Sequence, residues 1–267
     1  MSHRGIHRLI TVEDRAREWP VQGVGNAWSR EYFGGPFYLF NPPASGAPAI
    51  SLVFVQSRDG NTGASNPANL GGGPTDQHLI YEGLSRVAAD GVMAGASTIG
   101  PSLFFAISHP SLASLRHDLG LPRDPAQIVI SGEGRVDPDA RVFSRPDVPA
   151  YLLAGPRCLD RTCRQLRDRP WVRVIPIEGD LAAALTRLRS EYGVTRISCV
   201  GGRTTATSLV DAGLVQDIYL TTTAIAAGEP DTPWYAGTRR PTLATIVRKR
   251  EDVAAKPIEF AHFGVSL

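Results

Sequence analysis

Short apolar strand patterns alternate with amphipathic helical patterns along most of this 267-residue chain, and this alternation constrains the fold more than any other feature. Alternating strands and helices favour a parallel sheet flanked by helices. The strand patterns span residues 49–56, 91–98, 126–131, 149–155, 171–177, 195–202 and 216–226. The helical patterns span residues 76–89, 180–193 and 204–213.

Two further strand patterns, at 242–251 and 258–267, follow each other without an intervening helix. Consecutive strands of this kind pair antiparallel and can add an edge to a parallel sheet. The predicted fold class is therefore α/β, with a mixed, mainly parallel sheet of about eight or nine strands flanked by helices.

The first 47 residues differ from the rest of the chain. Gly and Pro separate their many aromatic side chains, and the breaker-rich stretch NPPASG closes the segment. The sequence predicts a loosely attached N-terminal arm, 1–47, ahead of a single domain, 48–267. The arm's aromatic residues are expected to pack on the domain, although they could also cover a site or a partner subunit. These aromatic residues are Trp19, Trp28, Tyr32, Phe33, Phe37, Tyr38 and Phe40.

The composition excludes several classes of protein. The net charge of +2 and the absence of a dense basic run argue against nucleic-acid binding. The apolar runs are too short to span a membrane, and the first residues lack a signal-peptide pattern. Three sparse cysteines, Cys158, Cys163 and Cys199, favour reduced thiols in a cytoplasmic protein. Cys199 lies in an apolar strand pattern, where it acts as a small hydrophobic residue.

Two adjacent glycines, Gly201 and Gly202, stand between a strand pattern and a helix pattern. A bare backbone at a helix N-terminus suits an anion such as a pyrophosphate. Arg203 and Thr204 follow and would add hydrogen-bond donors. A simple tight turn explains the same glycines, so the pattern leaves both interpretations open.

Two other strand ends carry similar chemistry. Gly95, Ser97 and Thr98 end one strand pattern, and Ser131 ends another, four residues before Arg135. A hydroxyl and a guanidinium in a glycine-rich turn suit a phosphate monoester such as the 2′-phosphate of NADP. Arg135 could instead be a solvated surface charge. Ligands of open α/β sheets bind at the carboxyl ends of strands, so one extended phosphorylated ligand would explain all three ends.

The first strand pattern of the domain leads into a long glycine-rich loop, 57–76. Asp59 closes a turn at its start and is either structural or placed at the mouth of a pocket. Thr75 or Asp76 is expected to cap the helix that follows. His78 lies in the first turn of that helix and has a packing or surface role, with proton donation as the minor alternative. The six histidines have no metal-ligand spacing, so no metal is predicted.

The ordered set of motifs resembles the C-terminal reductase domain of riboflavin biosynthesis, the RibD C-terminal family, over residues 48–267. The motifs are S-x-D-G, D-x-V-x-x-G-A-x-T, V-x-S-x-x-x-R-x-D-x-x-A-x-V-F, G-V-x-x-I-x-x-x-G-G-x-T and D-A-G-L-V-Q-D-I-Y-L. The resemblance implies a dihydrofolate-reductase-like fold, a homodimer and an NADPH-dependent reductase of a pyrimidine or pterin-like substrate. In the riboflavin pathway that substrate is 5-amino-6-(5-phosphoribosylamino)uracil.

The resemblance also implies roles for residues of this chain. Gly95, Ser97 and Thr98 would line the cofactor, and Ser131 and Arg135 would lie near its adenosine end. Asp59 would be the catalytic residue, near the nicotinamide and the substrate. The pyrophosphate would be held by Gly201, Gly202, Arg203 and Thr204.

Three departures from the family pattern fall on the substrate side. Val200 stands where the family usually has a glutamate, and Val53 where it often has a polar residue. The segment 99–119 is apolar and lacks the family's substrate-binding arginine. We therefore expect an NADPH-dependent oxidoreductase with a diverged heterocyclic, C=N or C=O substrate. The alternative is a catalytically idle relative that binds a nucleotide as a sensor or scaffold.

Overall fold

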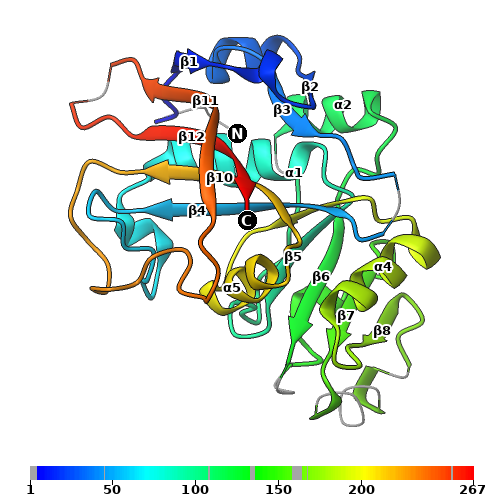
Figure 1. The fold of residues 1–267 in the computed structure, drawn as a ribbon. Coiled ribbons are helices and arrows are strands. Elements are labelled where there is room, and N and C mark those ends of the chain that lie inside the picture. The colour runs from blue at the N-terminus through cyan, green and yellow to red at the C-terminus, as the bar shows by residue number, and fades with distance from the viewer. Residues whose placement is uncertain are drawn as a thin grey trace.

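A computed structural model describes residues 5–44, 46–107, 109–132, 136–157, 164–166, 168–253 and 255–267 (Figure 1). The strands are β1 (Leu9–Asp14), β2 (Val21–Val24), β3 (Phe37–Phe40), β4 (Ala49–Gln56), β5 (Gly91–Gly95), β6 (Ala126–Ser131), β7 (Ala150–Ala154), β8 (Val172–Pro176), β9 (Arg196–Cys199), β10 (Val215–Thr222), β11 (Thr242–Glu251) and β12 (Glu259–Ser266). The helices are η1 (Ala16–Glu18), η2 (Ser29–Phe33), η3 (Pro67–Leu70), η4 (Thr75–Leu84), α1 (Ser85–Val87), α2 (Pro110–Asp118), η5 (Arg141–Phe143), α4 (Leu181–Tyr192) and α5 (Arg203–Asp211).

Ten strands form one sheet in the order β1-β11-β12-β10-β4-β9-β5-β6-β7-β8. All neighbouring strands from β10 to β8 run parallel, whereas β12, β11 and β1 pair antiparallel. The predicted α/β class with a mixed, mainly parallel sheet is therefore confirmed. The sheet gains its tenth strand from β1, which lies in the segment predicted to be an arm.

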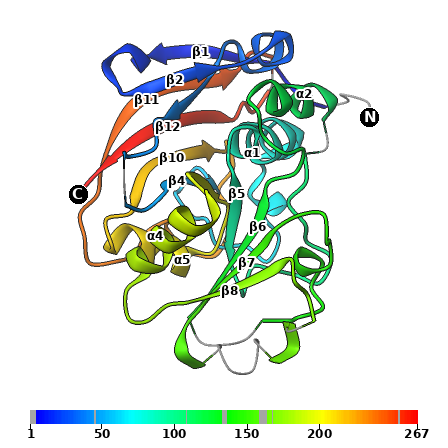
Figure 2. The ribbon, with the colours of Figure 1, turned by 90° about the vertical axis from the view of Figure 1, so that its right-hand side faces the viewer.

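Helices cover both faces of the sheet (Figure 2). On one face, Leu185 of α4 and Leu209 of α5 pack in the same buried cluster as Leu52 of β4. On the other face, Ile80 of η4 packs in a cluster with Val53 of β4. Adjacent residues of β4 thus point to opposite cores, as the two-residue period of a strand requires.

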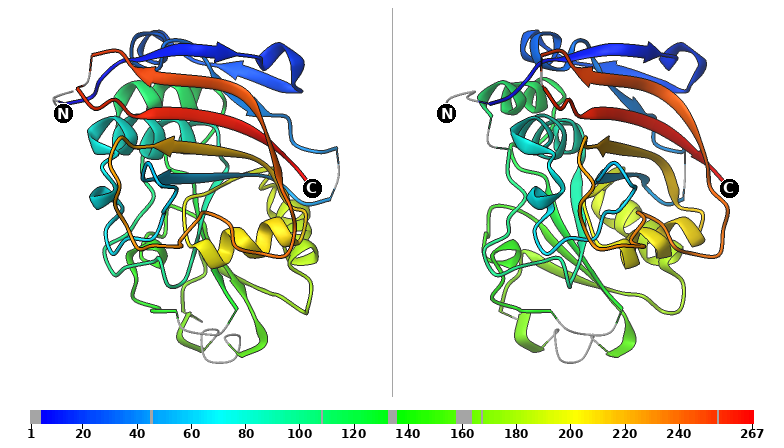
Figure 3. Two further views of the ribbon diagram at one scale, coloured as in Figure 1. Left: turned by 60° about the vertical axis from the view of Figure 1, so that its left-hand side comes forward. Right: turned by 90° about the vertical axis from the view of Figure 1, so that its left-hand side faces the viewer.

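The N-terminal segment is part of this architecture rather than a loose attachment. β1 pairs with β11, with Leu9 opposite Glu251 (Figure 3). β2 and β3 form a separate hairpin, and the preceding Trp19 lies so close to Gly264 that a Cβ there would fall 2.3 Å from its ring. Phe33 is 1% exposed and belongs to the same cluster as η4. The division at residue 47 stays a prediction, but the segment before it shares the core of the sheet.

A buried hydrogen-bonded pair of side chains joins the parallel and antiparallel parts of the sheet. The carboxylate of Asp217 on β10 lies 2.6 Å from Nε2 of His262 on β12. The hydroxyl of Ser51 on β4 donates to the same carboxylate at 2.7 Å. Both members of the pair are 1% exposed. Removing one partner from such a pair leaves an uncompensated buried polar group, which is strongly destabilising.

We expect Asp217→Ala to lower the free energy of unfolding by about 1–3 kcal/mol for each group that loses its partner, His262 and Ser51. Ser51→Ala is the control and should cost about 1 kcal/mol, the contribution of one hydrogen bond. Urea unfolding followed by circular dichroism measures both. Equal small losses for the two variants would show that the pair does not hold the three strands together.

Candidate functional site

The sheet order brings the predicted site residues to one edge. Neighbouring strands β4, β9, β5 and β6 all run parallel, so their carboxyl ends lie side by side. Asp59 follows β4, Gly201 follows β9, Thr98 follows β5, and Ser131 ends β6. Residues 158–163 and 133–135 lie outside the described residues, so the predicted role of Arg135 receives no structural description.

Two threonines fill the space left by the glycines. A Cβ on Gly95 would fall 2.6 Å from Oγ1 of Thr205, and one on Gly201 would fall 3.2 Å from Cγ2 of Thr98. Gly202 has a φ of +86° and would bring a Cβ to 3.2 Å from Oγ1 of Thr98. Close packing and a positive φ thus already account for the glycines. The case for a ligand rests on the polar groups beside them.

We expect Gly202→Ala to destabilise the protein by about 1–3 kcal/mol even without any ligand, because a side chain at this φ is strained. Gly201→Ala is the matched control: its φ is not positive, and its new methyl group would meet only the Thr98 side chain. Thermal unfolding of the two variants compares them directly. A Gly202→Ala protein that melts like the parent would contradict the strained turn.

The N-terminus of α5 is the polar part of this edge. Its N-cap is Gly202, which offers no side-chain hydrogen bond to the first turn. By contrast, the side chains of His109 and Asp180 cap α2 and α4. Arg203 and Thr204 in the first turn of α5 are exposed. Uncapped N–H groups at the positive end of a helix dipole favour an anion.

Hydroxyl groups from the turn after β5 extend this surface. Ser97 and Thr98 are exposed, and the turn that carries them is closed by a hydrogen bond of 2.9 Å from Thr98 N to Gly95 O. The N–H of Gly95 donates to Gly201 O at 3.4 Å, which joins this turn to the glycine pair. Gly95, Ser97, Thr98, Gly201 and Gly202 therefore lie together at the ends of β5 and β9.

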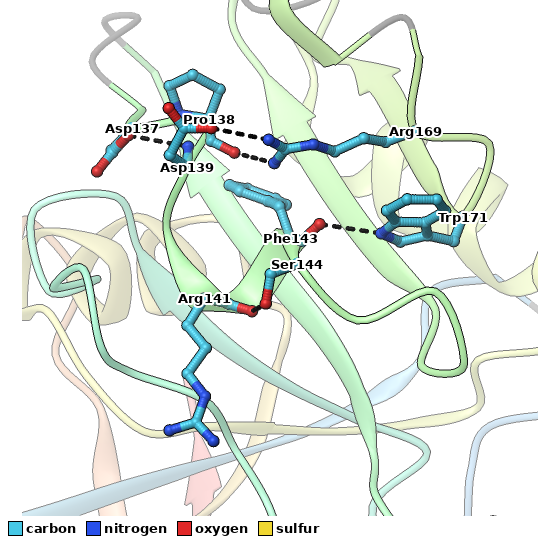
Figure 4. A network of polar contacts seen from close by, with 8 residues as sticks. All are labelled: Asp137, Pro138, Asp139, Arg141, Phe143, Ser144, Arg169 and Trp171. Carbon is cyan, nitrogen blue, oxygen red and sulfur yellow. Dashed lines mark hydrogen bonds and ion pairs between the residues drawn. The ribbon is translucent and has the colours of Figure 1, made fainter.

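Ser131 lies one strand further along the edge and is buried. The loop after it is held by the network in Figure 4, in which Arg169 contacts Asp139 at 2.8 Å and also the carbonyl of Pro138. Trp171 donates to the carbonyl of Phe143 at 2.9 Å. These contacts hold the segment that follows residues 133–135 in the sequence.

Asp59 stands in a turn after β4, and its carboxylate is exposed. The hydroxyl of Ser57 donates to it at 2.5 Å and the amide of Asn61 at 3.0 Å. The Ser57 hydroxyl, together with backbone N–H groups, lowers the pKa of Asp59 below its ordinary value. Asp59 is therefore an ionised hydrogen-bond acceptor rather than a proton donor.

The glycine-rich loop after Asp59 is anchored to the sheet edge. Thr223, just after β10, donates from its hydroxyl to Leu70 O at 2.6 Å. The hydroxyl of Thr75 donates to the carboxylate of Glu251 at 2.6 Å. The predicted helix cap is wrong: η4 has Pro74 at its N-cap, and neither Thr75 nor Asp76 caps it, because both side chains face the sheet instead.

Sequence reasoning placed Asp76 only as a possible helix cap and missed its unusual environment. Its side chain is half-buried, and burial raises the pKa of its carboxyl to about 6, against a smaller lowering effect of the Thr221 hydroxyl. Of the carboxyl groups with a resolved shift in the described chain, the pKa of Asp76 alone is raised. The sequence signal for this environment was an acidic residue, Asp76, between a glycine-rich loop and an apolar helix pattern.

The two valines that depart from the family pattern lie on the face covered by η4. Val53 belongs to the core cluster of η4, and Val200 packs against the same cluster. Leu52 pairs with Cys199, so the next residues along the two strands, Val53 and Val200, are neighbours. This part of the edge is therefore apolar.

Other candidate groups have structural partners. His78 forms a 2.9 Å contact with Glu82 one helical turn later. Cys199 is buried, which raises the pKa of its thiol to about 12 and makes it unreactive. Among the described residues, no three His, Cys, Asp or Glu side chains gather as a metal site would require. A search of the same residues for helices able to cross a membrane finds none.

A hollow of about 390 Å³ opens away from this edge, beside the amino ends of β6 and β7. Asp124, Arg145 and Asp147 are among its lining residues. It does not coincide with the strand-end site, and the exposed ion pair between Arg145 and Asp147 already satisfies two of its charges.

The raised pKa of Asp76 has a measurable effect on stability. The folded protein holds this proton more tightly than the unfolded chain, so its stability should fall as the pH rises from about 4 to 6. One such group contributes a slope of at most about 1.4 kcal/mol per pH unit. We expect Asp76→Asn to remove that part of the slope in urea unfolding at several pH values. An unchanged slope would show that Asp76 titrates normally.

Comparisons with solved structures identify the fold. A pyrimidine reductase-like protein from Corynebacterium diphtheriae is 21% identical, with a TM-score of 0.62 over 82% of this chain and 92% of its own. RibD of Acinetobacter baumannii is 15% identical, with a TM-score of 0.65 over 84% of this chain and 59% of its own. The fold is thus that of the RibD-like reductases.

Sequence comparison gives the family. The sequence profile of the RibD C-terminal domain matches residues 48–251. The 2,5-diamino-6-ribosylamino-4(3H)-pyrimidinone 5′-phosphate reductase of Methanothermobacter thermautotrophicus is 24% identical over 185 residues, which are 69% of this chain and 81% of the relative. The chain belongs to the RibD C-terminal domain family of reductases.

Proposed function

We propose that this protein is an NADPH-dependent reductase of a nitrogen heterocycle or a related C=N or C=O compound. The observation that supports the proposal most is the meeting of the turn at Gly95–Thr98 with the uncapped start of α5, in a member of a reductase family. A dinucleotide needs such a polar strand-end surface for its phosphates.

The residues present fit a nicotinamide cofactor. The N–H groups at the start of α5, with Arg203 and Thr204, would hold the pyrophosphate, and Ser97 and Thr98 would line it. Ser131 and Arg135 would lie at the adenosine end, where a 2′-phosphate would favour NADPH over NADH. When bound, the cofactor supplies a hydride. Asp59 would orient the cofactor or the substrate as a fixed acceptor.

The substrate is proposed to differ from the phosphoribosyl pyrimidine of the riboflavin pathway. Val53 and Val200 offer no polar contact, and Arg116 is the one arginine in the segment 99–119. Arg116 is fully buried, and its guanidinium donates to four backbone carbonyls, those of Pro122, Arg86, Val87 and Ala89. Because its side chain is fully buried, Arg116 is not accessible to a substrate phosphate.

The remaining parts of the proposal concern the cell and the assembly. We propose a cytoplasmic homodimer that acts on a small molecule. The apolar substrate side also favours a second candidate, a catalytically idle relative that binds the nucleotide as a sensor or scaffold. NADPH binding without reduction of any heterocycle would support that candidate.

We expect the protein to bind NADPH more tightly than NADH in a fluorescence titration.

Arg203→Ala should weaken NADPH binding by about 10- to 100-fold, because a charge-assisted hydrogen bond contributes about 1.5–3 kcal/mol. Arg187→Ala is the control, since Arg187 pairs with Glu191 on the exposed side of α4. Turnover of 5-amino-6-(5-phosphoribosylamino)uracil should be slow. Unchanged NADPH affinity in Arg203→Ala would show that the pyrophosphate lies elsewhere.

A further inference from the structure

We propose that the hollow of about 390 Å³ beside the amino ends of β6 and β7 is a second ligand site, which binds a phosphate monoester that carries an apolar ring. The proposal goes beyond the reductase activity and does not depend on it, because the hollow lies at the other end of the strands from the candidate cofactor site.

The strand connections place the hollow. Asp124, one of its lining residues, stands two residues before β6, and Pro149 immediately precedes β7. Ser131 ends β6 at the strand-end site. The five steps from Ala126 to Ser131 span roughly 17 Å at the usual rise of a strand. A small molecule in the hollow therefore leaves the strand-end site free, and small-molecule sites have volumes of about 300–1,000 Å³.

Apolar surfaces form one part of the wall. Ile107 and Val148 line the hollow from the buried side, and Pro149 lines it from the exposed side. The guanidinium of Arg145, another lining residue, lies 5.4 Å from the centre of the half-buried Phe104 ring. Packing against this ring restrains the Arg145 side chain. The apolar part of the wall suits a ring rather than a bare inorganic ion.

Charged side chains form the other part of the wall. Arg123 is exposed and the side chain of Arg145 is 41% exposed, so both are accessible to a ligand. Asp147 accepts two hydrogen bonds from Arg145, one of them 2.7 Å long, and its charge is thereby compensated. Oδ1 of Asp124 accepts a hydrogen bond from the N–H of Ile107 at 3.1 Å.

Two buried guanidinium groups stand directly behind the wall. Nη1 of Arg86 donates to the carbonyl of Ala106 at 2.7 Å, and Nε of Arg116 donates to the carbonyl of Pro122 at 2.8 Å. Ala106 and Pro122 both line the hollow. Arg86 is 4% exposed and Arg116 is 0% exposed. Among the described residues neither guanidinium forms an ion pair, and Nε of Arg86 and Nη2 of Arg116 have no hydrogen-bond partner.

The charges in and behind the wall leave an excess of positive charge. Burial lowers the pKa of both Arg86 and Arg116, the latter to about 10, so both guanidiniums are still charged at neutral pH. The carboxylates of Glu82 and Asp90 act on one guanidinium each, but neither residue lines the hollow. The groups that remain are four guanidiniums and two carboxylates: Arg86, Arg116, Arg123 and Arg145 against Asp124 and Asp147.

This combination selects the class of ligand. A concave surface with an excess of one charge concentrates ions of the opposite charge. Guanidinium groups match the oxygen atoms of a phosphate in pairs, and a phosphate monoester carries close to two negative charges at neutral pH. The accessible Arg123 and Arg145 would bind the phosphate, while Ile107, Val148 and Pro149 would contact the ring.

The test uses phenyl phosphate as the probe, with inorganic phosphate and phenol for comparison. Isothermal titration calorimetry measures the affinity of the parent and of Arg145→Gln, Asp147→Asn and Arg203→Ala. Arg187→Gln is the matched control, because Arg187 is an exposed arginine paired with a carboxylate on α4. Thermal unfolding without ligand confirms that each variant is folded.

We expect the parent to bind phenyl phosphate more tightly than either inorganic phosphate or phenol. Arg145→Gln should weaken this binding by about tenfold, as the loss of one charge-assisted hydrogen bond predicts. Asp147→Asn should strengthen it by about two- to fivefold, because the variant releases Arg145 from an exposed ion pair. Arg203→Ala and Arg187→Gln should bind as the parent does.

Three results would overturn the assignment. The first is a parent that binds phenyl phosphate no better than inorganic phosphate, or not at all. The second is an Arg145→Gln protein with parental affinity, or an Asp147→Asn protein with reduced affinity. The third is binding that Arg203→Ala removes and Arg145→Gln retains, which would place the anion at the strand-end site instead.

Discussion

The buried pair between Asp217 and His262 is the constraint on which the rest of the structure depends. β10 is the strand at which the sheet changes from parallel to antiparallel. The carboxylate of Asp217 on β10 contacts a residue on each neighbouring strand, Ser51 on β4 and His262 on β12. A one-residue slip of either neighbour would turn its polar side chain to the opposite face. The pair thereby sets where the carboxyl ends of β4 and β10 lie, and with them the loop that carries Asp76.

Much of the parallel part of the sheet could be predicted from local patterns, whereas its edge could not. The run 126–131 and the helix before Gly193 match β6 and α4 because apolar periodicity and a glycine stop signal are local features. β1 has no such signature, since its partner β11 lies far away in sequence. α2 was missed because Pro110 opens it inside a segment without clear helical periodicity.

The candidate site was predictable where its polar residues stand next to one another in the sequence. Glycines and hydroxyls at strand ends predicted a shared edge, and sheet order placed them there. The raised pKa of Asp76 was not predictable, because it depends on burial and is opposed by Thr221, which is distant in sequence. The glycine pair also shows a limit of motif reasoning: Thr98 and Thr205 fill the space that a ligand was expected to need.

The pairing of β1 with β11 also has a consequence for the order of folding. Leu9 meets Glu251, so residues made early in synthesis wait for nearly the whole chain before they find their partner. Until then Phe33 and Phe37, both fully buried in the finished protein, have no complete core to cover them. Contacts of such long sequence separation form late and slowly. The aromatic N-terminal segment thus stays exposed to chaperones and to aggregation until synthesis is nearly complete.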